Sequence, residues 1–517
     1  MDTQLTYPFR TEPYELQRSV WEATRDRRDY AIFWEQGTGK TWLAINTAAW
    51  LYMTGRIDAV FVLAPTDIHV NWDVPGEGVQ KHLPLELLKK SARLIWRTSK
   101  AGSKGFQKDL DKLMKHQGGM RWLFMGFDAF ATDKGFAAAQ RFLTTYRCLW
   151  VMDEAGRIKN PTAVRTKKAM KLRALAAFRR PMTGTPVTEK PFDAYSVINW
   201  MNATYWKQNG LGNFQAFKHN FGLWKKIKVA MGREVEVQRK DRDGRVLYQN
   251  LDELARLLKP ISSRVLKEDM VDLPPKVYTR MYYDMTPKQR AHYDRLEKEF
   301  MTFYEENSAP DPDNPDGPRI LMTSADLAIV RQLRLQQIAL GYLVSDDSKQ
   351  VHLIDDDPPS LKLLREVVED LSHPAIIWCR FRKDVELICG LLGNSAVRYD
   401  GTVDADGRRA AMVAFQGGHV PYFVATPDAA GEGLTLTAAK TAIYYSNSWR
   451  LIHREQSEDR CHRIGQGGVD HVQYIDIVAR NSIAEDILDG LMFKQETAAA
   501  AIGDRMRSRL SSYMTRE

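Results

Sequence analysis

The sequence predicts an α/β protein built from two tandem lobes, each a parallel sheet with helices on both faces, together with helical insertions. Short continuous apolar runs recur along the 517-residue chain and indicate fully buried strands. Helical stretches separate these runs, and strands that alternate with helices indicate parallel sheets. The runs form two sets, at residues 59–64, 122–125 and 148–152 and at residues 375–378, 421–425, 441–445 and 472–478.

Length and composition bound the class of protein. A chain of 517 residues is long enough for about two to four domains that each bury a core. We expect no transmembrane helix, because no apolar run reaches about 18 residues, and residues 1–10 lack a signal-peptide pattern. The four cysteines lack metal-site spacing, so a reducing cytosol is expected. A net charge of +9 permits a polyanionic partner without requiring one.

A glycine-rich segment follows the apolar stretch at residues 30–34 and precedes a helix-forming stretch at residues 42–50. Small residues between a strand and a helix let backbone N–H groups close around phosphate oxygens. The lysine of such a loop reaches the β- and γ-phosphates of ATP, and the hydroxyl group after it holds Mg²⁺. The full pattern also has a glycine where this chain has Trp34. The predicted phosphate-binding residues are Gly37, Thr38, Gly39, Lys40 and Thr41.

Tyr14 and Gln17 lie shortly before this loop. An aromatic ring can stack on adenine, and an amide can both donate to it and accept from it. We therefore expect this pair to contact the base, with a capped surface helix as the alternative.

An acidic pair, Asp153 and Glu154, follows the apolar run at residues 148–152. A carboxylate at the end of a buried strand can hold Mg²⁺, and its neighbour can polarise the water that attacks the γ-phosphate. Ligands bind at the carboxyl ends of parallel strands, where Lys40 and Thr41 are also expected. Together these residues predict a nucleotide hydrolase site.

A further strand ends at Thr183, Gly184 and Thr185. Small hydroxyl residues at that position can sense the γ-phosphate and pass its state to a second domain. We expect these three residues to couple the nucleotide to the rest of the molecule.

Three of these segments resemble motifs I, II and III of the superfamily 2 helicase-like ATPases: residues 37–41, 153–156 and 183–186. Residues 157–162 are similar to the corresponding stretch of the Swi/Snf-type family of double-stranded DNA translocases. That family usually has a histidine where this chain has Gly156. The resemblance implies two RecA-like lobes around a nucleotide cleft, with ATP and Mg²⁺ as the bound species.

Two segments of the second lobe extend the resemblance, because residues 430–436 look like motif V and residues 456–466 look like motif VI. Arg460 and Arg463 lie three apart on one helical face, and guanidinium groups fork onto phosphate oxygens. The resemblance implies that both act as arginine fingers across the cleft from Lys40, an effect worth roughly a thousandfold in rate. It also implies nucleotide contacts from Gly431, Glu432, Gly433 and Gln456.

The resemblance further implies a nucleic-acid surface at the strand ends that face the other side of the cleft. Contacts there go mostly to phosphates, so binding should be salt-sensitive and largely independent of base sequence. The expected contact residues are Thr66, Gly126, Lys159, Asn160, Arg380, Gly401 and Thr426.

A β-hairpin is predicted within residues 205–260, where residues 234–237 alternate and residues 246–248 can pair back across a turn at 243–244. Its basic tip can grip a phosphate backbone or wedge a strand junction, and an exposed solvated turn is an equal alternative. The basic residues are Arg239, Lys240, Arg242 and Arg245.

We expect five regions along the chain. They are a first lobe at 1–204, an insertion and the end of that lobe at 205–276, a helical connection at 277–350 with a flexible loop at 307–318, a second lobe at 351–492 and a basic helix at 493–517.

The predicted activity is DNA-stimulated ATP hydrolysis that drives translocation on duplex DNA by a cytosolic, nucleoid-associated monomer of bacterial or phage type. Residues 250–276 and 334–338 resemble the annealing-helicase and fork-remodelling branch, so forked or branched DNA is a candidate substrate. One alternative is a strand-separating or annealing helicase acting on DNA or RNA. The other is a scaffold that binds nucleotide without turnover.

Overall fold

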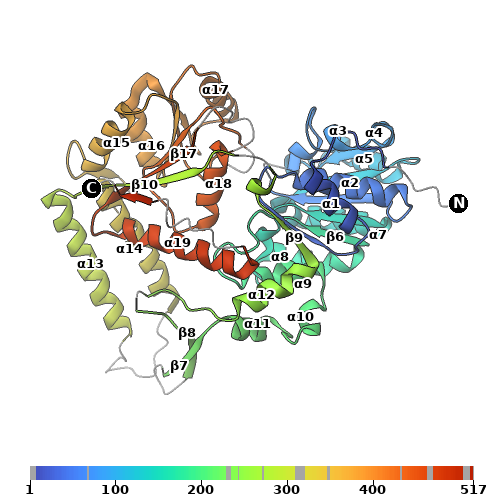
Figure 1. Ribbon diagram of the computed structural model, residues 1–517, viewed down its shortest axis with the longest axis horizontal. Coiled ribbons are helices and arrows are strands. Elements are labelled where there is room, and N and C mark those ends of the chain that lie inside the picture. Colours follow the sequence, from blue (N-terminus) through green and yellow to red (C-terminus); the bar gives the residue numbers. More distant parts are fainter. Residues whose placement is uncertain are drawn as a thin grey trace. The chain divides into compact units, whose positions relative to one another are not determined.

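The computed structural model describes residues 7–66, 69–228, 234–242, 244–270, 273–308, 321–345, 350–430, 434–462, 470–504 and 513–515 (Figure 1). Within residues 299–308, 321–328 and 513–515 it describes the backbone alone. Its contacts divide the chain into two compact units. The first unit comprises Met1–Phe221, Asn250–Asp272 and Thr497–Asp504, and the second comprises Gly222–Gln249, Leu273–Glu496 and Arg505–Glu517.

The first unit is built on a parallel sheet with strand order β3-β4-β2-β5-β6. A parallel pair, β1 and β9, joins this sheet through bridges from Asp29 to Arg179 and from Ile32 to Met182. The strands are β1 (Ala31–Trp34), β2 (Ala59–Ala64), β3 (Ala92–Ile95), β4 (Arg121–Gly126), β5 (Cys148–Met152), β6 (Phe178–Pro181) and β9 (Ser262–Val265).

Both faces of this sheet are covered because successive strand residues point to opposite sides. Val60 and Val62 share a buried cluster with Ile45 of α2. Phe61 and Trp150, on the other side of the sheet, contact aromatic rings of α6 and α9. The helices are α1 (Glu15–Thr24), α2 (Lys40–Met53), α3 (Gly78–His82), α4 (Leu85–Lys90), α5 (Lys104–Lys115), α6 (Phe127–Ala131), α7 (Asp133–Thr145), α8 (Val164–Leu172), α9 (Asp193–Met201), α10 (Tyr205–Gln208), α11 (Phe214–Phe221) and α12 (Leu251–Leu258).

The second unit contains a parallel sheet with strand order β14-β15-β13-β16-β17-β10-β18. Its strands are β10 (Lys276–Tyr283), β13 (Ala375–Trp378), β14 (Ala396–Tyr399), β15 (Tyr422–Ala425), β16 (Thr441–Tyr444), β17 (Val472–Ala479) and β18 (Tyr513–Thr515). Its helices are α13 (Pro287–Ser308), α14 (Leu321–Leu340), α15 (Pro359–Glu369), α16 (Arg382–Leu392), α17 (Ala405–Gln416) and α18 (Leu451–Cys461), together with α19 (Ile483–Ile502), whose last residues belong to the first unit. The predicted fold class, parallel sheets flanked by helices, is confirmed.

Two segments differ from the sequence-based expectation. The region predicted as a helical connection, 277–350, contains most of β10, which is a full strand of the second sheet. The β-branched and aromatic residues of β10 favour a strand. The same region also supplies β11 (Tyr342–Val344), which pairs with β12 (Val351–Leu353).

The hairpin also pairs differently. The main partner of β8 (Glu234–Gln238) is the upstream strand β7 (Trp224–Lys228). The downstream segment joins through the bridges from Lys240 to Val246 and from Gly222 to Tyr248. In the part of the chain that is described, no helix has the length and apolar character needed to span a membrane.

Candidate nucleotide-binding site and nucleic-acid surface

The phosphate loop lies between the end of β1 at Trp34 and the start of α2 at Lys40. Gly37 and Gly39 have φ angles of 82° and 91°, in the left-handed region that favours glycine. A Cβ atom at Gly39 would lie 2.2 Å from Nε2 of Gln17. The turn is therefore tight, and a side chain at its second glycine would be strained by the left-handed φ.

Lys40 is buried at the foot of this loop, and its Nζ donates to the carbonyl oxygens of Trp34 at 3.0 Å and Glu35 at 3.2 Å. Thr38 closes the turn by donating from Oγ1 to Glu35 O at 2.7 Å. Thr41 occupies the second position of α2. The ammonium group and the helix N-terminus thus place positive charge on one loop, as phosphate binding requires.

Gln17 is buried behind the loop. Its Nε2 donates to Thr38 O at 2.9 Å, and its Oε1 accepts from the backbone N–H of Tyr14 at 3.0 Å. Tyr14 itself is exposed at the start of α1. The structure therefore places Gln17 against the phosphate loop, and its contact with adenine stays a prediction.

The acidic pair follows β5, and Asp153 and Glu154 are each 8% exposed. Trp72 donates from Nε1 to Asp153 Oδ2 at 3.1 Å, which fixes that carboxylate. Glu154 has a φ of 50°, a left-handed conformation that costs about 1–3 kcal/mol for a residue other than glycine. The local fold thus holds a strained glutamate at the carboxyl edge of the sheet.

Thr183 connects the third predicted segment directly to this glutamate. Its hydroxyl donates to Glu154 Oε2 at 3.3 Å, and the backbone N–H of Thr185 donates to Thr183 Oγ1 at 3.2 Å. A Cβ atom at Gly156 would lie 3.9 Å from Thr183 Oγ1, at ordinary van der Waals distance. A side chain could therefore occupy the position of Gly156, but in this chain the threonine hydroxyl makes the link itself.

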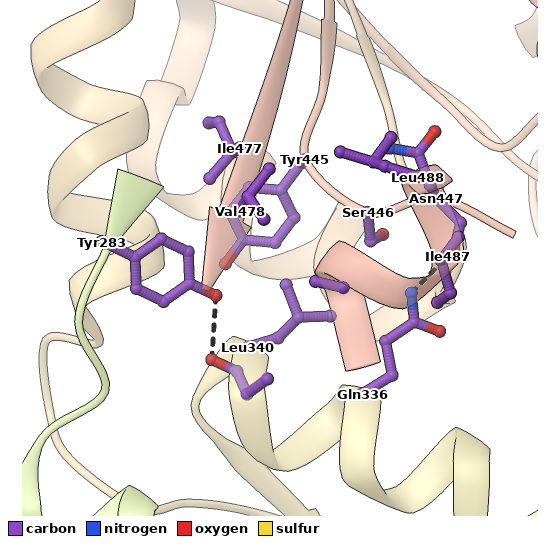
Figure 2. Close-up of a pocket in the computed structure, with 12 residues that line it drawn as sticks. Tyr283, Gln336, Leu340, Tyr445, Ser446, Asn447, Ile477, Val478, Ile487 and Leu488 are labelled. Carbon is purple, nitrogen blue, oxygen red and sulfur yellow. Dashed lines mark hydrogen bonds between the residues drawn. The ribbon is translucent and has the colours of Figure 1, made fainter. Parts of the chain in front are cut away.

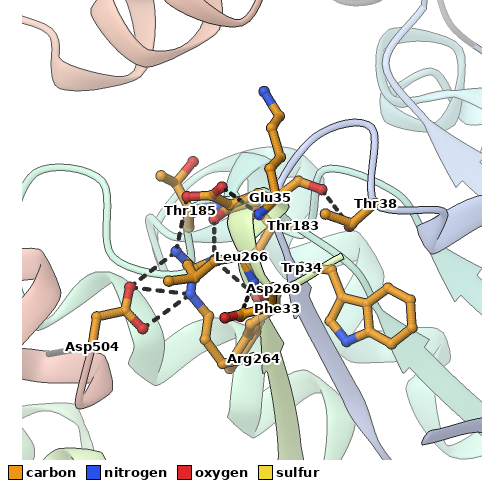
Figure 3. Close-up of polar contacts among 12 residues, drawn as sticks. Phe33, Trp34, Glu35, Thr38, Thr183, Thr185, Arg264, Leu266, Asp269 and Asp504 are labelled. Carbon is orange, nitrogen blue, oxygen red and sulfur yellow. Dashed lines mark hydrogen bonds and ion pairs between the residues drawn. The ribbon is translucent and has the colours of Figure 1, made fainter. Parts of the chain in front are cut away.

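Arg264 of β9 was missed by the sequence-based site prediction, and Figure 3 shows it at the centre of this region. Its Nη1 donates to Phe33 O and Gly184 O, each at 2.9 Å. Its Nη2 lies 3.0 Å from Asp504 Oδ2 and 3.6 Å from Glu35 Oε1. One guanidinium group thus joins the end of β1, the phosphate loop and the Thr183–Thr185 segment. Its sequence signal was its place in residues 250–276, the segment that resembles the annealing-helicase and fork-remodelling branch.

In the second unit, Arg460 lies on α18 and is 1% exposed. Its Nη1 donates to Leu434 O at 3.1 Å, and its own carbonyl oxygen accepts from Leu436 N at 2.9 Å. The segments predicted as motifs V and VI are therefore in contact. Gln456 lies half-buried on the same helix. The remaining predicted residues, Arg463, Gly431, Glu432 and Gly433, lie outside the described residues.

A buried ionic cluster fixes α18 and was not predicted from the sequence. Arg454 donates from Nε to Glu458 Oε1 at 2.9 Å and from Nη2 to Asp476 Oδ2 at 3.0 Å. Lys276 Nζ and Tyr278 OH each lie 2.8 Å from Glu458 Oε2. Burial raises the pKa of Glu458, but the neighbouring cations outweigh burial and hold that pKa well below its usual range. Glu458 therefore stays ionised in the folded protein.

The predicted nucleic-acid residues of the first unit follow neighbouring strands. Gly126 pairs with Ala64, so Thr66 lies beside it, and Thr66 donates from Oγ1 to Asp128 Oδ2 at 2.9 Å. Lys159 follows β5, the other neighbour of β2, and its Nζ lies 2.5 Å from Thr188 Oγ1. Asn160 is exposed, and its side chain accepts from the backbone of Thr162.

Arg380, Gly401 and Thr426 follow β13, β14 and β15, which are adjacent in the second sheet. Arg380 donates from Nη1 to Gln336 Oε1 at 2.9 Å. Gln336 in turn donates to Asn447 O at 2.7 Å beside a cavity of about 10 Å³ that Tyr283 and Tyr445 also line (Figure 2). The three predicted residues thus share one sheet edge, and their contact with nucleic acid stays a prediction.

Models of known families match most of this chain. The SNF2-related domain matches residues 31–327, which is more than half of the chain, and the helicase conserved C-terminal domain matches residues 360–465. The chain belongs to the SNF2-related family.

Curated relatives of this SNF2-related chain include an uncharacterized ATP-dependent helicase of Mycoplasma pneumoniae, 24% identical over 90% of this chain and 40% of that protein. Another is the mouse DNA annealing helicase and endonuclease ZRANB3, 25% identical over 93% of this chain and 39% of that protein. The chain therefore spans about two fifths of these relatives. A solved structure described as a Sulfolobus solfataricus SWI2/SNF2 ATPase core with dsDNA aligns with 98% of this chain at 20% identity and a TM-score of 0.40.

Arg380 also lies next to a buried carboxylate whose titration gives the first prediction. Asp384 is fully buried and accepts from Tyr342 OH at 2.8 Å, Ser446 Oγ at 2.6 Å and Phe381 N at 3.3 Å. Burial raises its pKa to about 6, although these hydrogen bonds act in the opposite direction. The folded protein therefore binds this proton more tightly than the unfolded chain does. The ionised group destabilises the fold above pH 6, and the penalty is relieved as the pH falls toward about 4.

We expect the Tm of the wild type to rise by a few degrees, about 2–4 °C, relative to Asp384→Asn as the pH falls from 7 to 5. The asparagine cannot titrate, so the variant serves as the reference at each pH. A difference in Tm that does not change with pH would contradict the raised pKa.

Proposed function

We propose that this chain is an ATP hydrolase whose activity is stimulated by DNA and drives translocation along duplex DNA. The observation that carries the proposal is the hydrogen bond from Thr183 to Glu154, 3.3 Å long, at the sheet edge that also holds the phosphate loop. Family membership and the resemblance of the second unit's motifs support the same reaction.

The residues present fit a magnesium nucleotide. The loop at 37–41 offers backbone N–H groups and the Lys40 ammonium to phosphate oxygens. Thr41 and Asp153 would hold Mg²⁺, which supplies charge neutralisation on the phosphates when bound. Glu154 takes the proton of the attacking water, and Thr183 orients its carboxylate. Arg460 and Arg463 supply positive charge to the transition state.

The test is the rate of ATP hydrolysis at fixed salt without nucleic acid and with single-stranded DNA, duplex DNA or RNA. We expect duplex DNA to give the largest stimulation, and the stimulation to fall steeply as salt rises, because the contacts are mostly to phosphates. Stimulation chiefly by single strands or RNA would overturn the duplex assignment. A rate that no nucleic acid changes would overturn stimulation by DNA.

A second candidate is an annealing or strand-separating helicase on forked DNA. The relative named as a DNA annealing helicase favours it, as does the antiparallel pair β7 and β8 with its exposed cations. We further propose that the chain acts as a monomer in the cytosol.

The Arg264 cluster gives a second prediction. Asp504→Asn removes the carboxylate that accepts from Nε and Nη2 of Arg264, at 3.0–3.2 Å. Arg264 is then left to shift toward Glu35, which disturbs the phosphate loop. We expect the KM for ATP to rise about three- to tenfold with a smaller change in kcat.

The matched control is Asp489→Asn, which removes a half-exposed carboxylate of α19 that lies 3.2 Å from Arg280 of β10 and should leave KM unchanged. The role assigned to Asp504 fails if both variants have the wild-type KM.

A further inference from the structure

Residues 222–228, 234–242 and 244–249 form a small antiparallel arm of the second unit that the proposed ATPase site does not use (Figure 1). Strands β7 and β8 pair from Trp224 with Gln238 to Lys228 with Glu234. At the base of the arm, Leu223 N donates to Leu247 O at 3.2 Å and Leu247 N donates to Arg239 O at 2.9 Å. Three segments therefore share hydrogen bonds at the base, which holds the arm in a defined conformation.

The two faces of this arm differ in charge because alternate strand residues point to opposite sides. On one face Lys226 lies opposite Glu236 and Lys228 opposite Glu234. Lys226 Nζ is also 3.5 Å from Glu234 Oε2. Cations and carboxylates on this face therefore largely neutralise one another.

The other face, which we name the apolar–basic face, carries no carboxylate among its described residues. It consists of Lys225, Ile227, Val235, Val237 and Arg239. Ile227 and Val235 are directly opposite each other, and each is 37% exposed. Lys225 and Arg239 are exposed at the same face, toward the base of the arm. The face thus combines two β-branched apolar side chains with two cations.

Exposed cations continue beyond this face at Lys240, Arg242 and Arg245. Such a surface fits a polyanion that also presents apolar surface. A nucleic acid with unstacked bases has both features, since phosphates pair with the cations and branched apolar side chains can pack between base steps. Two half-exposed side chains offer too little apolar area to anchor the arm in a membrane.

We propose that the apolar–basic face of this arm binds DNA where its two strands separate, with Ile227 and Val235 against the first unpaired bases and Lys225 and Arg239 on the flanking phosphates. This inference deepens the proposed function, on which its choice of DNA rests. It assigns the preference for forked DNA to the arm and leaves hydrolysis to the ATP site.

The test is fluorescence anisotropy at fixed salt, without ATP, on a forked duplex and a linear duplex with equal numbers of phosphates. The wild type should bind the fork more tightly. Ile227→Ser with Val235→Ser should lower affinity for the fork at least about threefold and leave the linear duplex unchanged. Lys225→Ala with Arg239→Ala should reduce the slope of log K against log salt concentration for the fork by about two.

The control is Lys226→Gln with Glu234→Gln, which changes the opposite face without changing net charge and should bind both DNAs as the wild type does. Circular dichroism checks that every variant is folded. If the Ile227→Ser, Val235→Ser protein does not fold, the salt dependence of the Lys225→Ala, Arg239→Ala protein still tests the proposal. An unchanged ratio of fork to linear affinity in the serine variant would overturn the proposal. Binding of the wild type to vesicles of anionic phospholipid but not to forks would also overturn it.

ATP hydrolysis on linear duplex DNA separates this inference from the proposed function. We expect the wild-type rate in all three arm variants. If the serine variant loses affinity for the fork but duplex DNA does not stimulate ATP hydrolysis by the wild type, the role of the arm is upheld and the proposed translocase is refuted.

Discussion

Glu154→Gln should lower the rate of ATP hydrolysis by about two to four orders of magnitude, while the affinity for nucleotide stays within about twofold of wild type. Glutamine keeps the size of the side chain and can still accept from the Thr183 hydroxyl, but it cannot take a proton from water. The ground state is therefore preserved and the chemical step is lost. The rate is measured by phosphate release, and binding is measured by titration with a fluorescent ATP analogue.

The control for this variant is Glu86→Gln, which removes an exposed carboxylate of the first unit paired with Lys89 at 3.0 Å. Exposed pairs contribute about 0–1 kcal/mol, so hydrolysis should be unaffected. A Glu154→Gln protein that hydrolyses ATP within about tenfold of wild type would show that another group accepts the proton.

Arg454→Met should reduce the free energy of unfolding by about 3–5 kcal/mol. The substitution removes the cation that lies between two buried carboxylates, Glu458 at 2.9 Å and Asp476 at 3.0 Å. Among the described residues, the side-chain partner that remains for the Asp476 carboxylate is the amide of Asn447, which donates to it at 2.8 Å. Because the cluster holds α18, the variant should also lose ATP hydrolysis. The measurement is urea denaturation followed by circular dichroism.

Arg450→Met is the matched control, since Arg450 immediately precedes α18 and lies 4.0 Å from Asp428 with most of its side chain exposed. It should change stability by less than about 0.5 kcal/mol. Equal losses in the two variants would mean that the buried cluster does not stabilise α18.

The parallel sheets could be predicted because buried strands are continuous apolar runs, as at β2 and β5. Strand β10 was missed as an element because it is not a continuous apolar run, although it pairs along its length with β17. The hairpin was predicted with the wrong main partner. Local turn residues indicated a turn at 243–244. Strand pairing, however, depends on which side chains pack across the strands. In the structure Val235 pairs with Ile227 of the upstream strand.

In the candidate site, too, features encoded by local sequence were predictable and contacts between distant residues were not. The loop at 37–41 and the acidic pair were predictable because their chemistry is local in sequence. The roles of Arg264 and Arg454 could not be predicted, because each depends on residues distant in sequence. Arg264 contacts Gly184 and Asp504. Arg454 contacts Asp476. Gln17 was expected at adenine, and only the structure places its amide on Thr38 O.

ATP-driven movement along duplex DNA can be measured as displacement of a third strand from a DNA triplex. The third strand is bound on a linear duplex, and its release is followed with ATP in the wild type and in Glu154→Gln. We expect ATP-dependent release by the wild type with the duplex intact, and no release by the variant. Failure of the wild type to release the third strand while it hydrolyses ATP, or separation of the duplex strands in place of release, would contradict translocation on duplex DNA.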